Sequence, residues 1–252
     1  MVSFSLEGKV ALITGASRGI GESVSKTLAE YGAHCILVSR KIEALRTVAD
    51  DIEKKGGKAV AMACHVGYPD SIETLIKEVE DQFGRLDILI NNAATNPFFG
   101  HMADADEKSW DKTIAVNLKG PFFMIRHAVE LMKKNGGGSI VNVSSVNGKR
   151  PAPFQGIYSI TKAGLIAMTQ AYARELAPYH IRVNALLPGI TKTDFSNALI
   201  ENEKIYKSAM QQVPMARHAE PEEMAGAVLY LVSDAASYTT GSCIVCDGGY
   251  LA

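Results

Sequence analysis

Short apolar, β-branched runs alternate with amphipathic stretches along nearly the whole chain, and this alternation is the strongest constraint on its fold. We expect strands at residues 9–14, 34–39, 59–64, 88–91, 139–144, 182–187 and 242–246. Helical patterns fill the intervals at residues 19–31, 41–55, 70–83, 106–134, 156–177 and 221–233. Strands that are apolar on both faces and separated by helices form a parallel sheet covered on both sides. The sequence therefore predicts one α/β domain over residues 1–252, with a doubly wound, seven-stranded parallel sheet.

Composition excludes several classes of protein. The chain has 26 Lys and Arg against 27 Asp and Glu, so it lacks the basic excess of a nucleic-acid or anionic-membrane binder. No apolar run reaches the roughly 20 residues of a membrane span. The N-terminal residues carry Glu7 and no basic region, which argues against a signal peptide. We therefore expect a cytoplasmic protein whose partner is a small molecule.

The four cysteines predict no disulfide scaffold. Cys243 and Cys246 have C-x-x-C spacing, but residues three apart on a strand point to opposite faces. We expect them to be buried structural residues rather than a metal or redox pair. The histidines show no metal-ligand spacing either, so no metal site is predicted.

One segment, at about residues 189–221, breaks the alternation. It is polar and rich in Lys and Glu, and it follows the sixth predicted strand. Long insertions of this kind usually form lids or binding loops. Because no second domain is available to hold a substrate, we expect this segment to act as a substrate lid.

A glycine-rich turn, Thr14–Gly21, joins the first strand to the first helix. Glycines there permit a tight turn and close approach of a pyrophosphate, which the N–H groups of the following helix can bind. The spacing is G-x-x-x-G-x-G rather than the common G-x-G-x-x-G. The predicted cofactor contacts in this turn are Gly15, Ser17, Arg18, Gly19, Ile20 and Gly21.

The end of the second strand favours a phosphorylated cofactor. An NAD enzyme usually has Asp or Glu there, whereas this chain has Ser39, Arg40 and Lys41. Guanidinium binds phosphate through charge-assisted bonds, and Arg18 could approach the same phosphate from the glycine turn. The pattern therefore predicts NADP(H). The alternative is that Arg40 and Lys41 are only a solvated helix start.

Tyr158 and Lys162 stand four residues apart in a helical pattern, so they share one face of the helix. Ser145 follows the strand at residues 139–144, at the edge where open α/β sheets bind ligands. This coincidence of a strand end, a hydroxyl and a Tyr-Lys helix indicates a catalytic site.

These motifs together resemble the short-chain dehydrogenase/reductase family, in its short single-domain branch. The resemblance covers essentially residues 6–249 and implies a Rossmann sheet of strand order 3-2-1-4-5-6-7 in a tetramer or dimer. It is carried by Thr14–Gly21, Asn91 to Ala94, Asn117, Ser145, Tyr158 to Lys162, Pro188 and Gly189 with Thr191, and Asp247 to Gly249.

The resemblance implies catalytic roles for four residues. Tyr158 would exchange a proton with the substrate oxygen, and Ser145 would hold that oxygen beside it. A phenol with a pKa near 10 is a poor base, so Lys162 would lower the pKa of Tyr158 and also hold the nicotinamide ribose. Asn117 would hold a water that links Lys162 to solvent.

Further cofactor contacts are implied by the same resemblance. Asn91 would lie along the adenosine half of the cofactor, and Thr191 would touch the nicotinamide carboxamide. The remaining expected contacts are Asn92, Ala93, Pro188 and Gly189.

Two positions depart from the family pattern. Ala94 replaces the usual Gly, and His65 stands where the family usually has an Asp that contacts the adenine amino group. A neutral imidazole nitrogen can accept that hydrogen bond. The alternative is an exposed loop histidine, with Val66 making backbone contacts to the base.

The substrate pocket is expected to be mainly apolar, which favours a carbonyl compound with a hydrophobic body over a sugar. Its predicted lining residues are Phe98, Asn147, Phe154, Gln155, Phe195 and Leu199. The run from Asn92 to Gly100 also resembles NADP-dependent carbonyl/retinal reductases.

Three functions follow from these observations. The first is an NADP(H)-dependent oxidoreductase that acts on a ketone, an aldehyde or a secondary alcohol. The second is a 3-oxoacyl-[acyl-carrier-protein] reductase, and the third is a non-catalytic NADP-binding regulator.

Overall fold

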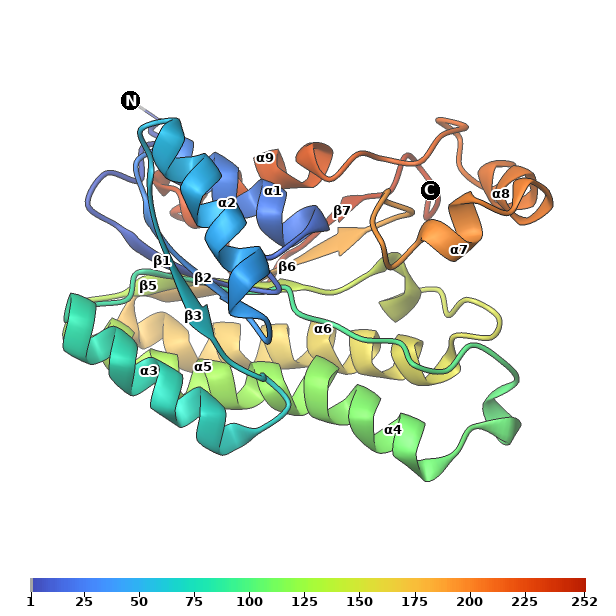
Figure 1. Cartoon of the computed structure of the whole chain (residues 1–252), viewed down its shortest axis with the longest axis horizontal. Helices are drawn as coiled ribbons and strands as arrows, with labels where there is room; N and C mark the ends of the chain where they lie inside the picture. The colour runs from blue at the N-terminus through green and yellow to red at the C-terminus, as the bar shows by residue number, and fades with distance from the viewer. Residues whose placement is uncertain (1) are drawn as a thin grey trace.

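Seven parallel strands form one sheet in the order β3-β2-β1-β4-β5-β6-β7 in the computed structural model, which describes residues 2–252 apart from the side chains of Ala198 and Leu199 (Figure 1). This confirms the fold class and strand order predicted from the sequence. The strands are β1 (Val10–Thr14), β2 (His34–Ser39), β3 (Lys58–Ala63), β4 (Ile88–Asn91), β5 (Gly138–Val143), β6 (Ile181–Pro188) and β7 (Cys243–Cys246). The longer helices are α1 (Gly19–Glu30), α2 (Ile42–Lys54), α3 (Pro69–Phe83), α4 (Glu107–Ile114), α5 (Gly120–Lys134), α6 (Gly156–Leu176) and α9 (Glu222–Val232).

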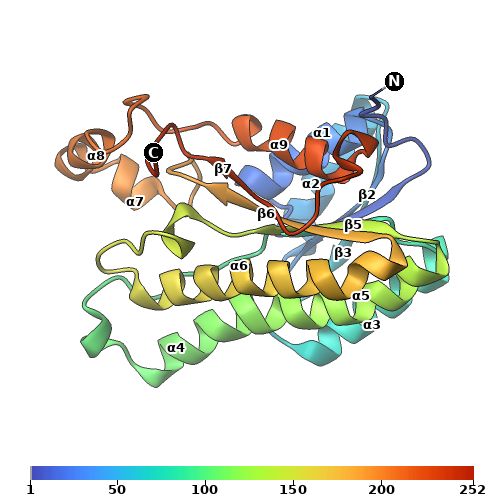
Figure 2. The same ribbon diagram turned by 180° about the vertical axis from the view of Figure 1, so that it is seen from behind.

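Helices cover both faces of the sheet, as the apolar strands require (Figure 2). One core packs α1, α2 and α9 against the sheet, with Leu28 and Val228 among its fully buried residues. The other packs α3, α5 and α6 against the opposite face, with Ile72 and Ile125 fully buried. Both faces of β1 are therefore dry, since all five of its residues are buried.

The strand order places a topological switch point beside β1. β1 pairs with β2 on one side and with β4 on the other. The first half of the chain therefore extends the sheet in one direction from β1, and the second half extends it in the opposite direction. Ligands of open α/β sheets bind at such a point, outside the carboxyl ends of the strands. The glycine-rich turn follows β1 at this edge.

The helix expected over residues 106–134 is interrupted. A π-helical turn at Ala115–Lys119 separates α4 from α5 and contains the buried Asn117. Such turns inside helices are frequent at functional sites.

The outer strand β7 corrects one prediction. Cys243 and Cys246 are half-buried free thiols rather than fully buried ones, because β7 lies at an edge of the sheet, and Val245 between them is exposed. The described residues contain no group of three or more His, Cys, Asp or Glu side chains that could hold a metal ion.

The segment predicted to be a lid contains two short helices, α7 (Asn197–Ile200) and α8 (Glu203–Met210). They project beyond the end of β6, at the carboxyl edge of the sheet (Figure 1). A hydrogen bond of 2.8 Å between the Tyr206 hydroxyl and His218 Nδ1 ties α8 to the end of the segment.

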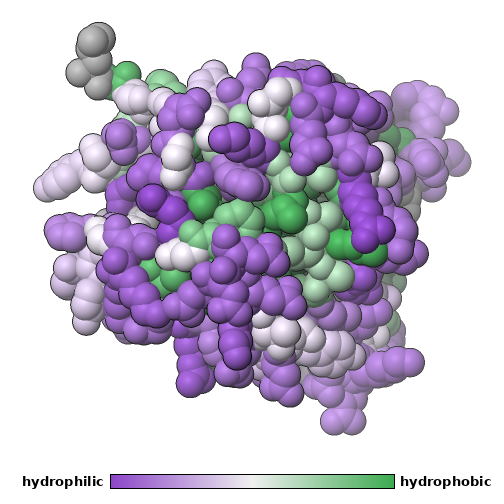
Figure 3. Space-filling view, turned by 60° about the vertical axis from the view of Figure 1, so that its left-hand side comes forward, coloured by the Kyte–Doolittle hydropathy of each residue, from purple (hydrophilic) through white to green (hydrophobic). Residues whose placement is uncertain are grey.

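The surface shown in Figure 3 is mainly hydrophilic, with a hydrophobic patch near its middle. None of the helices described within residues 2–252 is both long and apolar enough to cross a membrane.

Candidate active site

The glycine turn is shaped by backbone conformations and contacts that exclude side chains. Gly15 and Gly19 have φ values of +67° and +58°, in the left-handed region that favours glycine. A Cβ at Gly21 would collide with the carbonyl oxygen of Gly15. The turn therefore brings bare backbone to the start of α1, where a phosphate can approach closely.

Hydrogen bonds between Thr14, the last residue of β1, and the segment directly after the neighbouring strand β4 hold this turn in place. The Thr14 hydroxyl accepts hydrogen bonds from the backbone N–H groups of Asn92 and Ala93, at 3.0 and 3.1 Å. The Asn92 side-chain amide donates to the carbonyl oxygens of Thr14 and Gly15, at 2.9 and 3.2 Å. Asn92, predicted to contact the cofactor, thus uses its side-chain donors on the turn itself.

The start of α1 fits a pyrophosphate. Arg18 is the N-cap residue, and its side chain makes no capping hydrogen bond. The first N–H groups of a 12-residue helix, which carry the positive end of its dipole, therefore have no side-chain partner. Ser17 is half-buried beside them, and Ile20 packs its side chain against the core.

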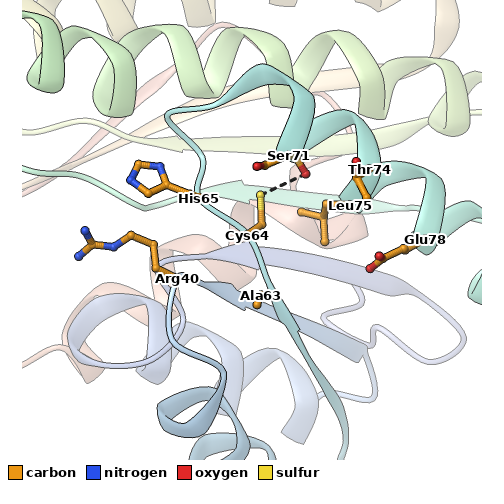
Figure 4. Close-up of a pocket in the computed structure, with 8 residues that line it drawn as sticks. All are labelled: Arg40, Ala63, Cys64, His65, Ser71, Thr74, Leu75 and Glu78. Atoms are coloured by element: carbon orange, nitrogen blue, oxygen red, sulfur yellow. Dashed lines mark hydrogen bonds between the residues drawn. The ribbon is translucent and has the colours of Figure 1, made fainter.

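A cavity of about 410 Å³ lies at the carboxyl ends of β2 and β3 (Figure 4). It brings together two predicted cofactor residues, Arg40 and His65, which lie at one end, whereas Glu78 lies at the other. The remaining lining residues are Ala63, Cys64, Ser71, Thr74 and Leu75. Ser39 is not among the lining residues, and its hydroxyl donates to the carbonyl of Lys41 at 3.2 Å.

Arg18 lies elsewhere. Its guanidinium forms an ion pair of 2.5 Å with Asp194, in the predicted lid segment, and it does not line the cavity with Arg40. The approach of Arg18 to the same phosphate as Arg40 stays a prediction, and it would require Arg18 to leave Asp194. Both partners of this ion pair are largely exposed, so its contribution to stability is only about 0–1 kcal/mol.

Ser145, Tyr158 and Lys162 come together behind the end of β5. Ser145 caps a short turn after the strand, and its Oγ accepts a hydrogen bond of 3.1 Å from Asn147 N. Tyr158 and Lys162 lie on the inner face of α6, with exposed fractions of 8% and 2%. Lys162 Nζ lies 5.4 Å from the centre of the Tyr158 ring and donates to the carbonyl oxygen of Val143 at 2.7 Å.

Burial shifts the proton equilibria of both side chains. It raises the pKa of Tyr158 to about 12, against which a hydrogen bond from Ser145 acts in the opposite direction. Burial also lowers the pKa of Lys162 from its ordinary 10.5 to about 7. The sequence predicts instead that Lys162 lowers the pKa of Tyr158. The causes of the Tyr158 shift in this structure are burial and the Ser145 hydrogen bond, and the effect of Lys162 on the pKa of Tyr158 stays a prediction.

Asn117 is fixed by three hydrogen bonds. Its side chain accepts from Thr95 N and donates to Thr95 O, both at 2.8 Å, and it also donates to Thr161 Oγ1 at 3.2 Å. Both amide hydrogens are therefore engaged, and Asn117 fastens the loop after β4 to α6. The water relay to Lys162 stays a prediction.

The side chain of Asn91 is engaged inside the sheet, and its contact with the cofactor stays a prediction. It is buried, and its Nδ2 donates to Asn142 Oδ1 at 2.9 Å. Asn142 in turn donates to Thr169 Oγ1 on α6, also at 2.9 Å. This polar chain inside the sheet connects β4 and β5 to the helix that carries Tyr158.

Three residues predicted to contact the cofactor lie at or just after the end of β6. Pro188 is its last residue, and a Cβ at Gly189 would lie 2.7 Å from Asp247 Cα, so only glycine fits. Thr191 is 6% exposed and donates to the carbonyl of Gly189 at 3.2 Å.

The backbone after β3 is also tightly packed, since a Cβ at Gly120 would lie 2.5 Å from the carbonyl oxygen of Val66.

The predicted substrate residues divide into two groups. Phe195 packs on Tyr158, with 5.3 Å between ring centres, and Asn147 donates to Gln155 at 3.2 Å near Ser145. Phe154 instead lines a separate apolar cavity of about 540 Å³ and packs on Phe99 and His101.

The other two substrate predictions are not placed in either group. Phe98 packs near Gly100, where a glycine Cβ would lie 2.9 Å from the end of its ring. The side chain of Leu199 lies outside the described residues.

The sequence interpretation missed two residues near the site. Asp194 pairs with Arg18, and Met102 lines the apolar cavity with Phe154. A lone acidic residue in a polar segment carries no sequence signal for its partner. Ile160 lies inside the Tyr158–Lys162 motif, is exposed and lines the same cavity. An apolar residue on the outer face of this helix is the signal that could have indicated the cavity.

A doubly wound parallel sheet with a glycine turn at its switch point defines the class as a Rossmann-type α/β enzyme. The family model described as Enoyl-(Acyl carrier protein) reductase matches residues 15–251. Dehydrogenase/reductase SDR family member 4 of Homo sapiens is 40% identical over 244 residues, which are 97% of this chain and 88% of that protein. The chain belongs to the short-chain dehydrogenase/reductase family and is an oxidoreductase.

Solved structures agree with this assignment. A short-chain type dehydrogenase/reductase from Mycobacterium marinum has 37% identity and a TM-score of 0.93, covering 98% of this chain and 97% of that chain. A gluconate 5-dehydrogenase from Burkholderia cenocepacia, solved in complex with NADP and tartrate, has 30% identity and a TM-score of 0.95 over the same shares of the two chains.

Proposed function

We propose that this protein is an NADP(H)-dependent reductase of ketones or aldehydes, with Tyr158 as the proton donor. The observation that carries the proposal is the pairing of a buried, protonated phenol with the Ser145 hydroxyl at the carboxyl end of β5. A pKa of about 12 keeps Tyr158 protonated at neutral pH. The protonated phenol can therefore donate a proton to a carbonyl oxygen bound at Ser145.

The cofactor would be held by the glycine turn, the start of α1 and Arg40, and when bound it supplies the hydride. Gly15, Gly19 and Gly21 keep side chains out of a tightly packed turn, so that bare backbone at the start of α1 can approach a pyrophosphate closely. Arg40, at the cavity end away from Glu78, fits a 2′-phosphate. The Burkholderia cenocepacia gluconate 5-dehydrogenase, which was solved with NADP bound, supports this choice.

Ser145 would bind the carbonyl oxygen and align it with the Tyr158 hydroxyl, so that the proton moves over a short distance. Lys162 Nζ is held by the carbonyl of Val143 and lies 5.4 Å from the centre of the Tyr158 ring, and we expect it to take part in returning a proton to Tyr158 after the reaction. With a pKa of about 7, Lys162 exchanges protons readily near neutral pH.

The substrate would have an apolar body. Phe195 lies directly on Tyr158, so a substrate carbonyl at Tyr158 has an aromatic wall beside it. Asn147 and Gln155 bond to each other, which leaves fewer polar groups for sugar hydroxyls. The competing substrates are a 3-oxoacyl thioester on an acyl-carrier protein and, from the relative's name, a sugar acid such as gluconate.

A substrate panel tests the proposal. NADPH consumption would be measured with a diketone, an aromatic ketone, an acetoacetyl thioester and 5-ketogluconate. We expect the highest kcat/KM with the diketone or the aromatic ketone. Preference for the thioester or the sugar acid would contradict the substrate class, and tight NADPH binding without turnover would favour the regulator.

The cofactor choice is tested by Arg40→Asp. Loss of charge-assisted hydrogen bonds worth about 1.5–3 kcal/mol should lower kcat/KM for NADPH by roughly 10–100-fold and leave NADH efficiency equal or higher. Arg46→Asp, the same charge change at an exposed position on α2, is the control. Equal or better efficiency with NADH in the wild type would refute NADP(H).

The protein is also proposed to form a homodimer or homotetramer. Exposed apolar side chains on α4, α5 and α6 support this, namely Trp110, Phe122 and Ile160, each 41–42% exposed. Sedimentation equilibrium would check it, and a monomer at micromolar concentration would contradict it.

A further inference from the structure

His65 lies half-buried directly after β3, at the same end of the cavity as Arg40 (Figure 4). Two contacts fix its imidazole ring. Nδ1 accepts a hydrogen bond of 3.1 Å from the backbone N–H of Gly67. The ring also packs on Tyr68, with 4.5 Å between the ring centres. The orientation of His65 is therefore set by its own loop and does not depend on a ligand.

The Gly67 contact determines which nitrogen carries the proton. A backbone N–H can only donate, so Nδ1 must present its lone pair to it. A neutral imidazole then carries its hydrogen on Nε2, because one nitrogen accepts and the other donates. Nε2 has no hydrogen-bond partner among the residues that the structure describes. The cavity is therefore lined by a preoriented hydrogen-bond donor.

We propose that His65 donates Nε2–H to an acceptor on the edge of the purine base and so makes the cofactor site tolerant of a 6-oxo purine in place of adenine. The proposal rests on the proposed function in one respect, because Arg40 at the 2′-phosphate puts the attached base in the cavity that His65 lines. The sequence expectation was the opposite, with the imidazole accepting from the adenine amino group. The Gly67 hydrogen bond occupies the nitrogen that would have to accept.

A donor at this position recognises different base chemistry from a carboxylate. Adenine presents the ring nitrogen N1 as an acceptor, and hypoxanthine presents its 6-oxo group. Nε2–H can bond to either of them, so the 6-amino group is not required. A carboxylate facing the 6-position, which only accepts, would bond to the amino group of adenine and would repel the 6-oxo oxygen of hypoxanthine. His65 therefore predicts tolerance of a 6-oxo purine cofactor.

The test compares dissociation constants of NADPH and reduced nicotinamide hypoxanthine dinucleotide phosphate, measured by nicotinamide fluorescence at pH 8, where free imidazole is neutral. We expect the two constants to agree within about twofold for the wild type. In His65→Asp, the 6-oxo cofactor should bind at least about fivefold more weakly than NADPH, the effect of one hydrogen bond worth about 1 kcal/mol. Circular dichroism confirms that the variant is folded.

Two results would overturn the proposal. One is a wild type that binds the 6-oxo cofactor more than fivefold more weakly, and the other is an unchanged ratio in His65→Asp. Repeating both measurements with NADH and its 6-oxo analogue separates this proposal from the proposal that Arg40 binds the 2′-phosphate. If NADH binds as tightly as NADPH, the assignment of Arg40 to the 2′-phosphate is wrong. The ratio of the dissociation constants of the 6-oxo and adenine cofactors, compared between the wild type and His65→Asp, still tests the role of His65.

Discussion

Lys162 gives the most detailed prediction, because its burial has a calculable cost. The shift of its pKa from 10.5 to about 7 disfavours the charged form in the folded protein. At 1.36 kcal/mol per pH unit, the full cost is about 5 kcal/mol. The folded pKa lies below the unfolded one, so this cost is fully present below pH 7 and disappears as the pH rises to 10.5.

Lys162→Met removes the charge and keeps an unbranched chain in the same space. Between pH 7 and 9.5, the unfolding free energy of the wild type should rise relative to that of the variant by about 1.4 kcal/mol per pH unit. The variant also leaves the carbonyl of Val143 without its donor. That loss of about 1–3 kcal/mol does not depend on pH and shifts only the offset between the two curves.

The assay is urea unfolding of both proteins without cofactor at a fixed protein concentration, because an oligomer's stability depends on concentration. Lys55→Met, at an exposed position after α2, is the control and should run parallel to the wild type. If the unfolding free energies of Lys162→Met and the wild type ran parallel against pH, burial would not lower the pKa of Lys162, and the explanation would be refuted.

Two further variants test the nucleotide end of the site. Gly21→Ala should unfold at lower urea concentration and lose NADPH binding, because its Cβ meets the Gly15 carbonyl. Gly226→Ala, with open space around its Cβ in α9, should instead gain up to about 1 kcal/mol. Asp194→Asn should release Arg18 and tighten NADPH binding by no more than about fivefold at low salt, since an exposed ion pair contributes at most about 1 kcal/mol. Equal stability of the two glycine variants, or weaker NADPH binding by Asp194→Asn, would contradict these explanations.

The sheet could be predicted because both of its faces are buried. Continuous apolar runs such as Val10–Thr14 and Ile88–Asn91 indicate strands between two helical layers, and the structure confirms the strand order. The exposure of Cys243 and Cys246 could not be predicted, because no local pattern distinguishes an edge strand from a central one. Strand position depends on pairing over the whole sheet.

The site was predictable where the chemistry is local. Tyr158 and Lys162 share a helix face by their spacing alone, and the structure places Ser145 beside them. Contacts between distant segments were not predictable, such as the pairing of Arg18 with Asp194, 176 residues later. The shift of the Tyr158 pKa was also missed, because its sign depends on how deeply both side chains are buried.

The central claim is that Tyr158 donates the proton in an NADPH-dependent reduction. It is tested most directly by the single-turnover rate of NADPH oxidation by Tyr158→Phe with the best ketone substrate, beside Tyr172→Phe on the same helix as control. We predict a loss of at least about 100-fold, the lower range for general acid catalysis, with NADPH affinity within about twofold of the wild type. A Tyr158→Phe variant that retains more than a tenth of the wild-type rate would contradict the account.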